Sequence, residues 1–262
     1  TAAWLAQRGV PFWITIPAAG TMAALLGAVA GLPSLRIKGL YLAVATLAMQ
    51  FLLEYVFREW ESVTGGVRGV NVPNASVFGF ELLNDSRMYY LIVPVAAVLL
   101  VLARNLFRTR VGRAFIAIRD KDISAEVLGI NLLHYKLAAF AIGSFYAGVG
   151  GALLGYFYRA MTPEYFSLQL SIFYLAVIIV GGLGSLVGTI FGAVFMTLVP
   201  EALRFLVSIA AQWSPRATEI LSPIQQVVFG LLIIGFLVYE PHGLVVIWRR
   251  VRRFFHLWPF RT

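Results

Sequence analysis

The sequence predicts an all-α fold: a polytopic transmembrane helical bundle with about seven membrane-inserted segments and one short cytoplasmic helix. Of the 262 residues, 60% are hydrophobic and only 13% are charged. Several apolar runs also approach the roughly 20 residues that a helix needs to cross a bilayer. A soluble domain with a large core does not need runs of that length, so we expect one transmembrane domain over residues 1–262.

Basic residues decide the orientation of the first two spans. Residues 11–30 form the first apolar run, and Arg36 and Lys38 follow it. Because positive residues favour the cytoplasmic side, the loop that carries them is predicted to be cytoplasmic. The second run, 39–57, then leads outward. Residues 58–87 hold acidic side chains with Gly and Asn turn signals, which are typical of an external loop.

The later spans follow the same rule. Residues 88–107 return to the cytoplasm, where the basic loop 108–136 gives the same orientation as the first loop. Residues 137–157 lead outward again. The tail, 240–262, is rich in arginine and is therefore predicted to be cytoplasmic. An odd number of crossings must separate this tail from the external loop that precedes it.

One further reversal of the chain is needed to satisfy that count. Only two long apolar runs remain, 171–199 and 226–239. Glycines permit a tight reversal and interrupt what would otherwise be one long helix. The first run is therefore predicted to form a hairpin or re-entrant pair over residues 166–181 and 186–208. The predicted reversal glycines are Gly181, Gly182 and Gly184.

Small residues at four-residue spacing predict close helix packing in three places. A role in gating or in the substrate pathway stays open for the third set, because it lies beside the predicted reversal. The three sets are Gly27 with Gly31, Gly151 with Gly155, and Gly184 with Gly188 and Gly192.

The residues present exclude several kinds of chemistry. The only lysines are Lys38, Lys121 and Lys136, and none follows a glycine, so a Walker A phosphate loop is excluded. The chain has no cysteine, and its histidines lack metal-ligand spacing. We therefore predict no enzyme activity, no metal site and no cofactor in this chain. The net charge of +9 lies mainly at the ends of spans, which indicates membrane orientation rather than nucleic-acid binding.

Glu54 is a carboxylate within a predicted span. Ionisable groups in hydrocarbon are costly and usually serve a function or find a partner. Glu54 lies near the outer end of its span, and Arg58 follows four residues later on the same helix face. The spacing favours an ion pair at the interface, and a polar lining of a translocation path is the alternative.

The cytoplasmic loop contains signals for a short helix. Asp120 or Asp122 can cap its N-terminus, and Gly129 with Asn131 can end it. A helix of about two turns is marginal in water, so we expect it to pack on a partner or to lie on anionic lipid. Its apolar ridge is predicted to consist of Ile123, Val127 and Ile130.

The same region carries a resemblance to a known family. Residues 112–156, GRAFIAIRDKDISAEVLGINLLHYKLAAFAIGSFYAGVGGALLGY, resemble the permeases of branched-chain amino acid ABC transporters, specifically the M-type subunit. The resemblance covers residues 36–244. Three shorter patches agree with it: residues 64–66 with Gly69 and Pro73, residues 181–193, and residues 240–244. Arg68 and His242 depart from the residues that are usual in the family, and Arg68 bears on what the outer vestibule admits.

The resemblance implies a permease subunit of an ABC importer that moves branched-chain or other neutral amino acids across the bacterial inner membrane. The implied partners are a second homologous permease subunit, two ATP-binding subunits that hold ATP and magnesium, and a periplasmic substrate-binding protein. Import of urea, short amides or aromatic acids by the same architecture is the alternative, and an ATP-independent channel or facilitator is another. Because the family usually has additional spans before residue 36, we expect spans that precede this chain.

The resemblance also bears on the candidate site residues. The loop around 118–131 matches the coupling-helix region that docks on the ATP-binding subunits. The element at 64–66 is either a tight turn or a set of exposed backbone N–H groups that favour a substrate carboxylate. The implied coupling residues are Arg119, Asp120, Ile123, Ala125, Glu126, Val127, Gly129 and Ile130. The candidate pathway or gate residues are Glu54, Thr64, Gly65, Gly66, Gly181, Gly182 and Gly184.

Overall fold

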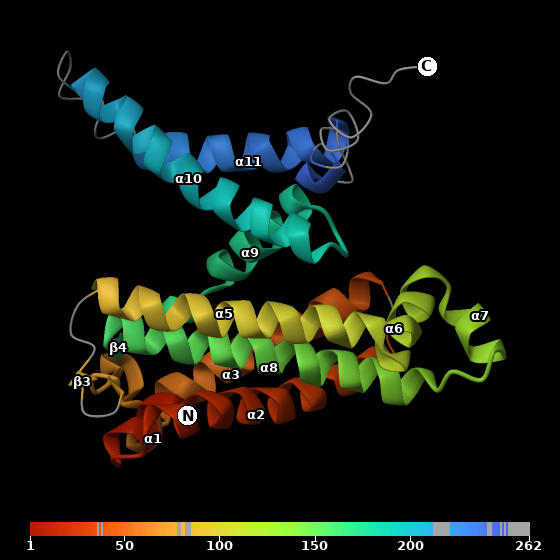
Figure 1. Ribbon diagram of the computed structural model, residues 1–262, viewed down its shortest axis with the longest axis horizontal. Coiled ribbons are helices and arrows are strands. Elements are labelled where there is room, and N and C mark those ends of the chain that lie inside the picture. The colour runs from red at the N-terminus through yellow and green to blue at the C-terminus, as the bar shows by residue number, and fades with distance from the viewer. Residues whose placement is uncertain are drawn as a thin grey trace. The chain divides into compact units, whose positions relative to one another are not determined.

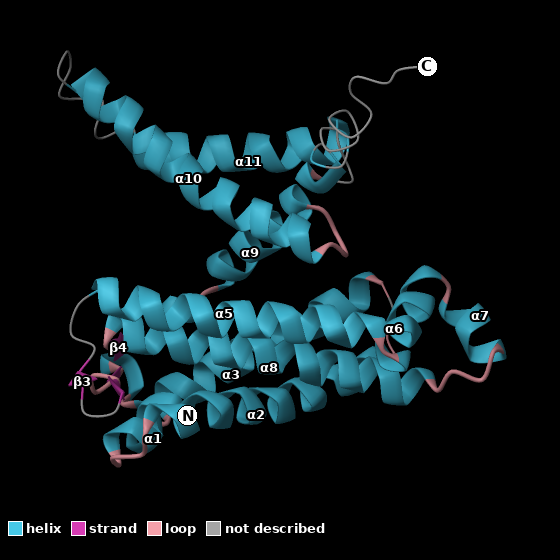
Figure 2. Cartoon of the chain, in the orientation of Figure 1, coloured by secondary structure: helices cyan, strands magenta, loops and turns pink. Residues whose placement is uncertain are grey.

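The computed structural model divides into two compact units, residues Thr1–Ser167 and Leu168–Thr262. Both units consist mainly of long helices (Figures 1 and 2). The structure describes residues 1–35, 37, 39–77, 80–81, 85–211, 221–239, 243–246, 248 and 250. The basic residues Arg36 and Lys38, and most of the predicted tail 240–262, lie outside the described residues.

The first unit contains four long helices joined by short elements. Its long helices are α2 (Phe12–Gly31), α3 (Leu40–Glu59), α5 (Asp85–Arg108) and α8 (Leu132–Tyr158). Its short helices are α1 (Ala2–Gln7), η1 (Leu32–Leu35), α4 (Glu61–Thr64), η2 (Gly66–Arg68), α6 (Arg110–Asp120), α7 (Asp122–Val127) and η3 (Pro163–Phe166). Its strands are β1 (Val70–Asn71), β2 (Ser76–Val77), β3 (Phe80–Glu81) and β4 (Ala160–Met161).

Helices α2 and α8 form the main packed pair of the first unit. Glycines on α2 let the two backbones approach, as the predicted Gly27 and Gly31 pair required. A Cβ at Gly27 would overlap Ser144, and one at Gly31 would lie 2.9 Å from Phe140 Cγ. The packing therefore depends on glycine at both positions.

A buried cluster continues this packing toward the first turn of α2. Phe12 and Ile16 of α2 pack with Val149 and Leu153 of α8, and Met88 of α5 joins them. Within the cluster, Thr15 Oγ1 and the Tyr156 hydroxyl lie 2.6 Å apart, and Thr15 is fully buried. The cluster holds α2, α5 and α8 together.

The two loops that are predicted to be external meet at one end of the first unit. Strand β1 pairs antiparallel with β4, with Val70 opposite Met161 and Asn71 opposite Ala160. The Val72 N–H extends the pairing by donating to Arg159 O at 2.9 Å. Helices α6 and α7, from the predicted cytoplasmic loop, lie at the opposite end (Figure 1). This arrangement agrees with the orientation that the basic residues predicted.

The second unit contains the predicted reversal. It consists of α9 (Leu168–Gly181), α10 (Leu186–Ala211) and α11 (Leu221–Tyr239). Helix α9 ends at Gly181, and α10 begins five residues later at Leu186. Ala176, Val177 and Val180 of α9 pack against Met196 of α10 in a small buried core. The long apolar run is therefore split as predicted.

Six helices in the described part of the chain are long and apolar enough to cross a membrane. Helix α11, with 19 residues, adds a seventh long helix. The predicted bundle of about seven segments is thus confirmed. Several boundaries differ from the sequence prediction: α8 begins at Leu132 rather than 137, α11 begins at Leu221 rather than 226, and α10 ends at Ala211 rather than 208. In addition, α6 forms a separate helix of 11 residues. Thr109 is the N-cap of α6, and its side chain accepts a hydrogen bond from the Gly112 N–H. The sequence prediction was based on apolar runs and did not use this single capping residue.

Candidate functional site

The first candidate site is the turn that follows α3. The Thr64 hydroxyl lies 2.6 Å from Phe57 O and 2.7 Å from Trp60 O, so its single proton is shared between two carbonyls at the end of α3. The Gly66 N–H donates back to Thr64 Oγ1 at 3.3 Å. Thr64 therefore fastens the start of the turn to the preceding helix.

The glycines of this turn are required by backbone geometry. Gly65, Gly66 and Gly69 have φ values of +68°, +60° and +71°, which side chains with a Cβ rarely adopt. The Gly65 N–H donates to Glu61 O at 3.0 Å, and the Gly69 N–H donates to Gly66 O at 3.2 Å. Because these donors already have acceptors within the chain, the geometry favours the tight turn over an open set of amides for a substrate.

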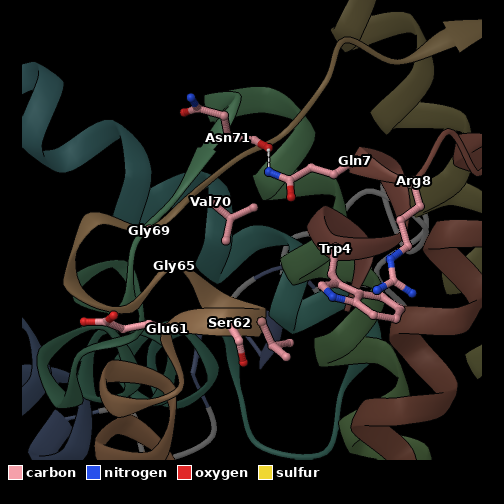
Figure 3. Close-up of a pocket in the computed structure, with 10 residues that line it drawn as sticks. Trp4, Gln7, Arg8, Glu61, Ser62, Gly65, Gly69, Val70 and Asn71 are labelled. Carbon is pink, nitrogen blue, oxygen red and sulfur yellow. Dashed lines mark hydrogen bonds between the residues drawn. The ribbon is translucent and has the colours of Figure 1, made fainter.

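A polar cavity of about 450 Å³ opens beside this turn. We call it the outer cavity, and its walls come from α1, α4 and the residues up to β1 (Figure 3). The Arg8 guanidinium lies 3.4 Å from the centre of the Trp4 ring. Gln7 Nε2 donates to Asn71 O at 3.0 Å and joins the end of α1 to β1. Sequence reasoning missed these residues, although Trp4 and Arg8 at i,i+4 spacing before the first span were visible in the sequence.

Glu54 lies one turn before the end of α3. Its Oε1 is 2.8 Å from Arg58 Nη2, as the i,i+4 spacing predicted. The Glu54 side chain is 22% exposed and the Arg58 side chain 48%. Gln50 lies four residues earlier, and its Nε2 is buried without a hydrogen-bond partner among the described residues. Glu54 and the turn at Thr64, Gly65 and Gly66 thus gather at the same end of α3.

The second candidate site is the short helix α7. Asp122 Oδ1 accepts a hydrogen bond from the Ile123 N–H at 2.9 Å, whereas Asp120 pairs with Arg119 at 2.9 Å. The predicted cap is therefore wrong in its position: Lys121 is the N-cap residue, and Asp122 is the first residue of the helix, where its carboxylate contacts the next backbone N–H. Gly129 ends the turn with φ of +81°. Ala125 faces inward and is 1% exposed.

The apolar ridge of α7 differs in one residue from the prediction. Ile123 and Val127 are 71% and 83% exposed, as expected for a docking surface. Leu128 is 79% exposed and joins them. Ile130 is partly buried, because the chain leaves the helix after Val127 and the Ile130 N–H turns back to Ala125 O at 3.0 Å. The charged residues Arg119, Asp120 and Glu126 lie exposed around this surface.

The third candidate site is the reversal between α9 and α10. Gly182 and Gly184 have φ of +117° and +77°, so the turn uses both glycines. The close helix contact is made by Gly181 against Gly188 and Gly192, where an added Cβ would overlap backbone atoms of the facing helix. The packing series is therefore 181, 188 and 192 rather than the predicted 184, 188 and 192. Gly184 lies in the turn, outside both helices.

Two patches of the resemblance meet at this reversal. A Cβ at Gly243 would overlap the backbone N of Gly182, so residues near 243 lie directly against the turn. Gly243 itself has φ of +71° and is buried. The contact explains why glycine is needed on both segments.

The sequence pattern of the family described as "Branched-chain amino acid transport system / permease component" matches residues 1–237. The chain belongs to this permease family. It is 31% identical over 220 residues to the "High-affinity branched-chain amino acid transport system permease protein LivM" of Escherichia coli (strain K12), a match that covers 75% of this chain and 52% of that protein. It is 29% identical over 219 residues to the corresponding permease protein LivH of Salmonella typhimurium, with 79% of this chain and 64% of that protein covered. No solved structure matches the chain.

This member of the permease family spans about half the length of the LivM proteins that it matches. Family membership and the six apolar helices identify a multi-pass protein of the bacterial inner membrane. In the described part of the permease, no group of three or more His, Cys, Asp or Glu side chains could hold a metal ion. The candidate sites are accordingly surfaces, turns and a cavity.

Proposed function

We propose that this chain is the translocation subunit of an ABC importer that moves branched-chain or other neutral amino acids into the cytoplasm, driven by ATP hydrolysis in partner subunits. Membership of the permease family supports the transport role. The observation that favours a coupled pump over a passive channel is the set of exposed apolar side chains on α7, at the end of the unit predicted to be cytoplasmic. Exposed apolar groups outside the bilayer favour a docking partner.

The proposed complex contains a second homologous permease subunit, two ATP-binding subunits and a periplasmic substrate-binding protein. Similarity to both LivM and LivH proteins supports a pair of related permeases. ATP and magnesium would be held by the ATP-binding subunits, since the sequence excludes a Walker A loop here. The chain itself would be neither an enzyme nor a cofactor-binding protein, and it would form one transmembrane domain in the complex.

Contacts around α7 provide a route for coupling. Lys136 Nζ of α8 lies 4.0 Å from Asp122 Oδ2 of α7. The rings of Phe115 in α6 and Tyr135 in α8 meet edge to face, with centroids 6.2 Å apart. Because α8 also packs tightly against α2, displacement of α7 by an ATP-binding subunit would shift a packed helix pair. Such interfaces switch between discrete arrangements rather than deforming continuously.

The decisive experiment is ATPase activity of the co-expressed complex in lipid, with purified binding protein and leucine, then urea, then an aromatic acid. Stimulation by leucine is expected. Stimulation by urea or an aromatic acid alone would change the substrate class. Passive solute flux through liposomes, with no ATP-binding subunit that co-purifies, would replace the pump by a facilitator.

A variant of α7 tests the docking surface separately. Val127→Asp places a charge in the proposed apolar contact, so we expect the ATP-binding subunits to dissociate during purification and stimulated ATPase activity to fall at least tenfold. Val127→Leu keeps the surface apolar and serves as the matched control. Normal association of the Val127→Asp complex would contradict the role of α7.

A further inference from the structure

We propose that the arginines at the junction of α5 and α6 form a binding site for an anionic phospholipid of the cytoplasmic leaflet, with their guanidinium groups on the lipid phosphate. The inference goes beyond the proposed function, because it concerns a lipid and not the transported solute. We call these residues the basic cluster: Arg104 and Arg108 of α5, and Arg110 and Arg113 of α6.

The basic cluster carries a positive charge that the chain does not neutralise. No acidic residue occurs between Asp85 and Asp120, and Asp120 pairs with Arg119 at 2.9 Å. All four arginines of the cluster are exposed, and none of them forms an ion pair within the described part of the chain. A guanidinium can present two N–H donors to the oxygens of a phosphate, so the cluster complements a phosphate-bearing ligand.

The turn between the helices holds the two halves of the cluster together. The Thr109 hydroxyl donates to Leu106 O at 2.7 Å, and its oxygen accepts from the Gly112 N–H at 3.4 Å. A Cβ at Gly112 would overlap Leu106 O, so α6 begins directly against the end of α5. Arg113 Nη1 donates to Arg108 O at 3.2 Å, which leaves the other N–H groups of this guanidinium for a ligand. Donors that are already positioned lose little entropy on binding.

The spacing on α5 favours a lipid over a soluble anion. Arg104 and Arg108 are four residues apart and share one face of the helix. Leu100 lies four residues before Arg104 on the same face, and Leu100 and Val101 are 38% and 55% exposed. Both belong to the segment Ser86–Arg108, which is long and apolar enough to cross a membrane. A phospholipid presents acyl chains and then a phosphate in this order, whereas a free phosphate has no apolar part to cover these side chains.

The position of the cluster fits the inner leaflet. Helix α6 lies at the end of its unit that is predicted to be cytoplasmic, opposite the paired strands (Figure 1). Anionic lipids attract basic segments that border a membrane span. Helix α6 leads through Lys121 directly into α7. A lipid on the cluster would therefore hold the base of the loop that carries the proposed docking surface.

Fluorescence quenching by brominated lipid measures which lipid occupies this position. The chain has no cysteine, so Leu100→Cys in the complete complex, with cysteine-free partner subunits, provides one labelling site beside the cluster. In bilayers that mix phosphatidylglycerol and phosphatidylcholine with the same acyl chains, brominating one lipid at a time gives their relative binding constant at the label. We expect phosphatidylglycerol to be preferred by on the order of tenfold. Val93→Cys, on the same face of α5 but nearer its outer end, is the control and should show no preference.

Second variants in the Leu100→Cys background test the arginines. Arg108→Gln should lower the preference at least threefold, and Arg104→Gln with Arg108→Gln should bring the two lipids to within about twofold of each other. Lys121→Gln removes one exposed cation of the same loop outside the cluster, so it is the matched control for Arg108→Gln and should leave the preference unchanged. Arg104→Lys with Arg108→Lys keeps the charge but loses the paired donors, so the preference should fall about threefold.

Four outcomes would overturn the proposal. An equal preference at Val93→Cys, or a preference that survives the loss of both arginines, would show that no site exists at the cluster. A full preference with lysine at both positions would leave only general attraction to the surface charge. Loss of the preference in added inorganic phosphate would make the cluster a site for soluble anions. A preference that appears only after removal of the ATP-binding subunits would make the cluster a protein contact.

Discussion

The buried contact between Thr15 and Tyr156 predicts an asymmetric double-mutant cycle. Thr15 Oγ1 donates to Phe12 O at 2.9 Å. A hydroxyl has one proton, so at the 2.6 Å contact Tyr156 must be the donor and Thr15 the acceptor. Removing the donor and removing the acceptor therefore leave different groups unsatisfied.

The expected magnitudes follow from that assignment. Tyr156→Phe removes one hydrogen bond but leaves Thr15 bonded to Phe12 O, so it should lower the free energy of unfolding by about 0.6 kcal/mol, typical of bonds between membrane helices. Thr15→Val leaves the Tyr156 O–H buried without an acceptor, which should cost about 1–3 kcal/mol. The double variant removes both polar groups and should cost less than Thr15→Val alone.

Equilibrium unfolding in mixed micelles, followed by circular dichroism during SDS titration, measures all four proteins. A double variant whose loss of unfolding free energy equals the sum of the single losses would show that the bond carries no coupling energy. A larger loss for Tyr156→Phe than for Thr15→Val would reverse the donor assignment and refute the reasoning.

Three further predictions concern the helices. Gly188→Ala places a methyl group against Gly181 O and should lower the free energy of unfolding by about 1–3 kcal/mol. Gly143→Ala is the control: a Cβ there meets nothing within 4 Å, so it should be neutral or stabilising in the same SDS titration. Equal effects of the two variants would contradict the close packing at Gly188. Glu54→Gln breaks a partly exposed ion pair with Arg58 and should lower the free energy of unfolding by less than about 0.5 kcal/mol. If leucine uptake falls strongly while the stability stays normal, Glu54 belongs to the substrate pathway. Gln50→Leu removes a buried unpaired amide and should leave the isolated chain as stable or more stable, and a loss seen only in the assembled complex would place the partner of Gln50 in another subunit.

Much of the fold was predictable because its signals are local. Apolar runs of bilayer length predicted the spans, and the glycines near 181–184 predicted the reversal that separates α9 from α10. The i,i+4 spacing predicted the ion pair between Glu54 and Arg58. Each of these features depends on neighbours within a few turns of one helix. The periodicity of the sequence contains that information.

The candidate sites were predicted only in part. Ile123 and Val127 are exposed on α7, as expected. The third exposed apolar residue is Leu128 and not the predicted Ile130, because the helix ends at Val127 and the chain then turns Ile130 back toward Ala125. The outer cavity was missed because Arg8 and Glu61 are far apart in sequence, and neither lies in a recognisable motif. The coupling and pathway roles of the sequence-derived residues stay predictions.

The sequence by itself determined the membrane class, the family and the approximate number of long helices, and it predicted their orientation. These properties follow from hydrophobicity, charge and short-range spacing, which can be read from the sequence without knowing how the helices pack. Only the tertiary structure decided that β1 pairs with β4, that Tyr156 donates to Thr15, and that Trp4, Arg8 and Glu61 share one cavity. Such contacts join residues separated by tens of positions, and their energy exists only after the helices have packed.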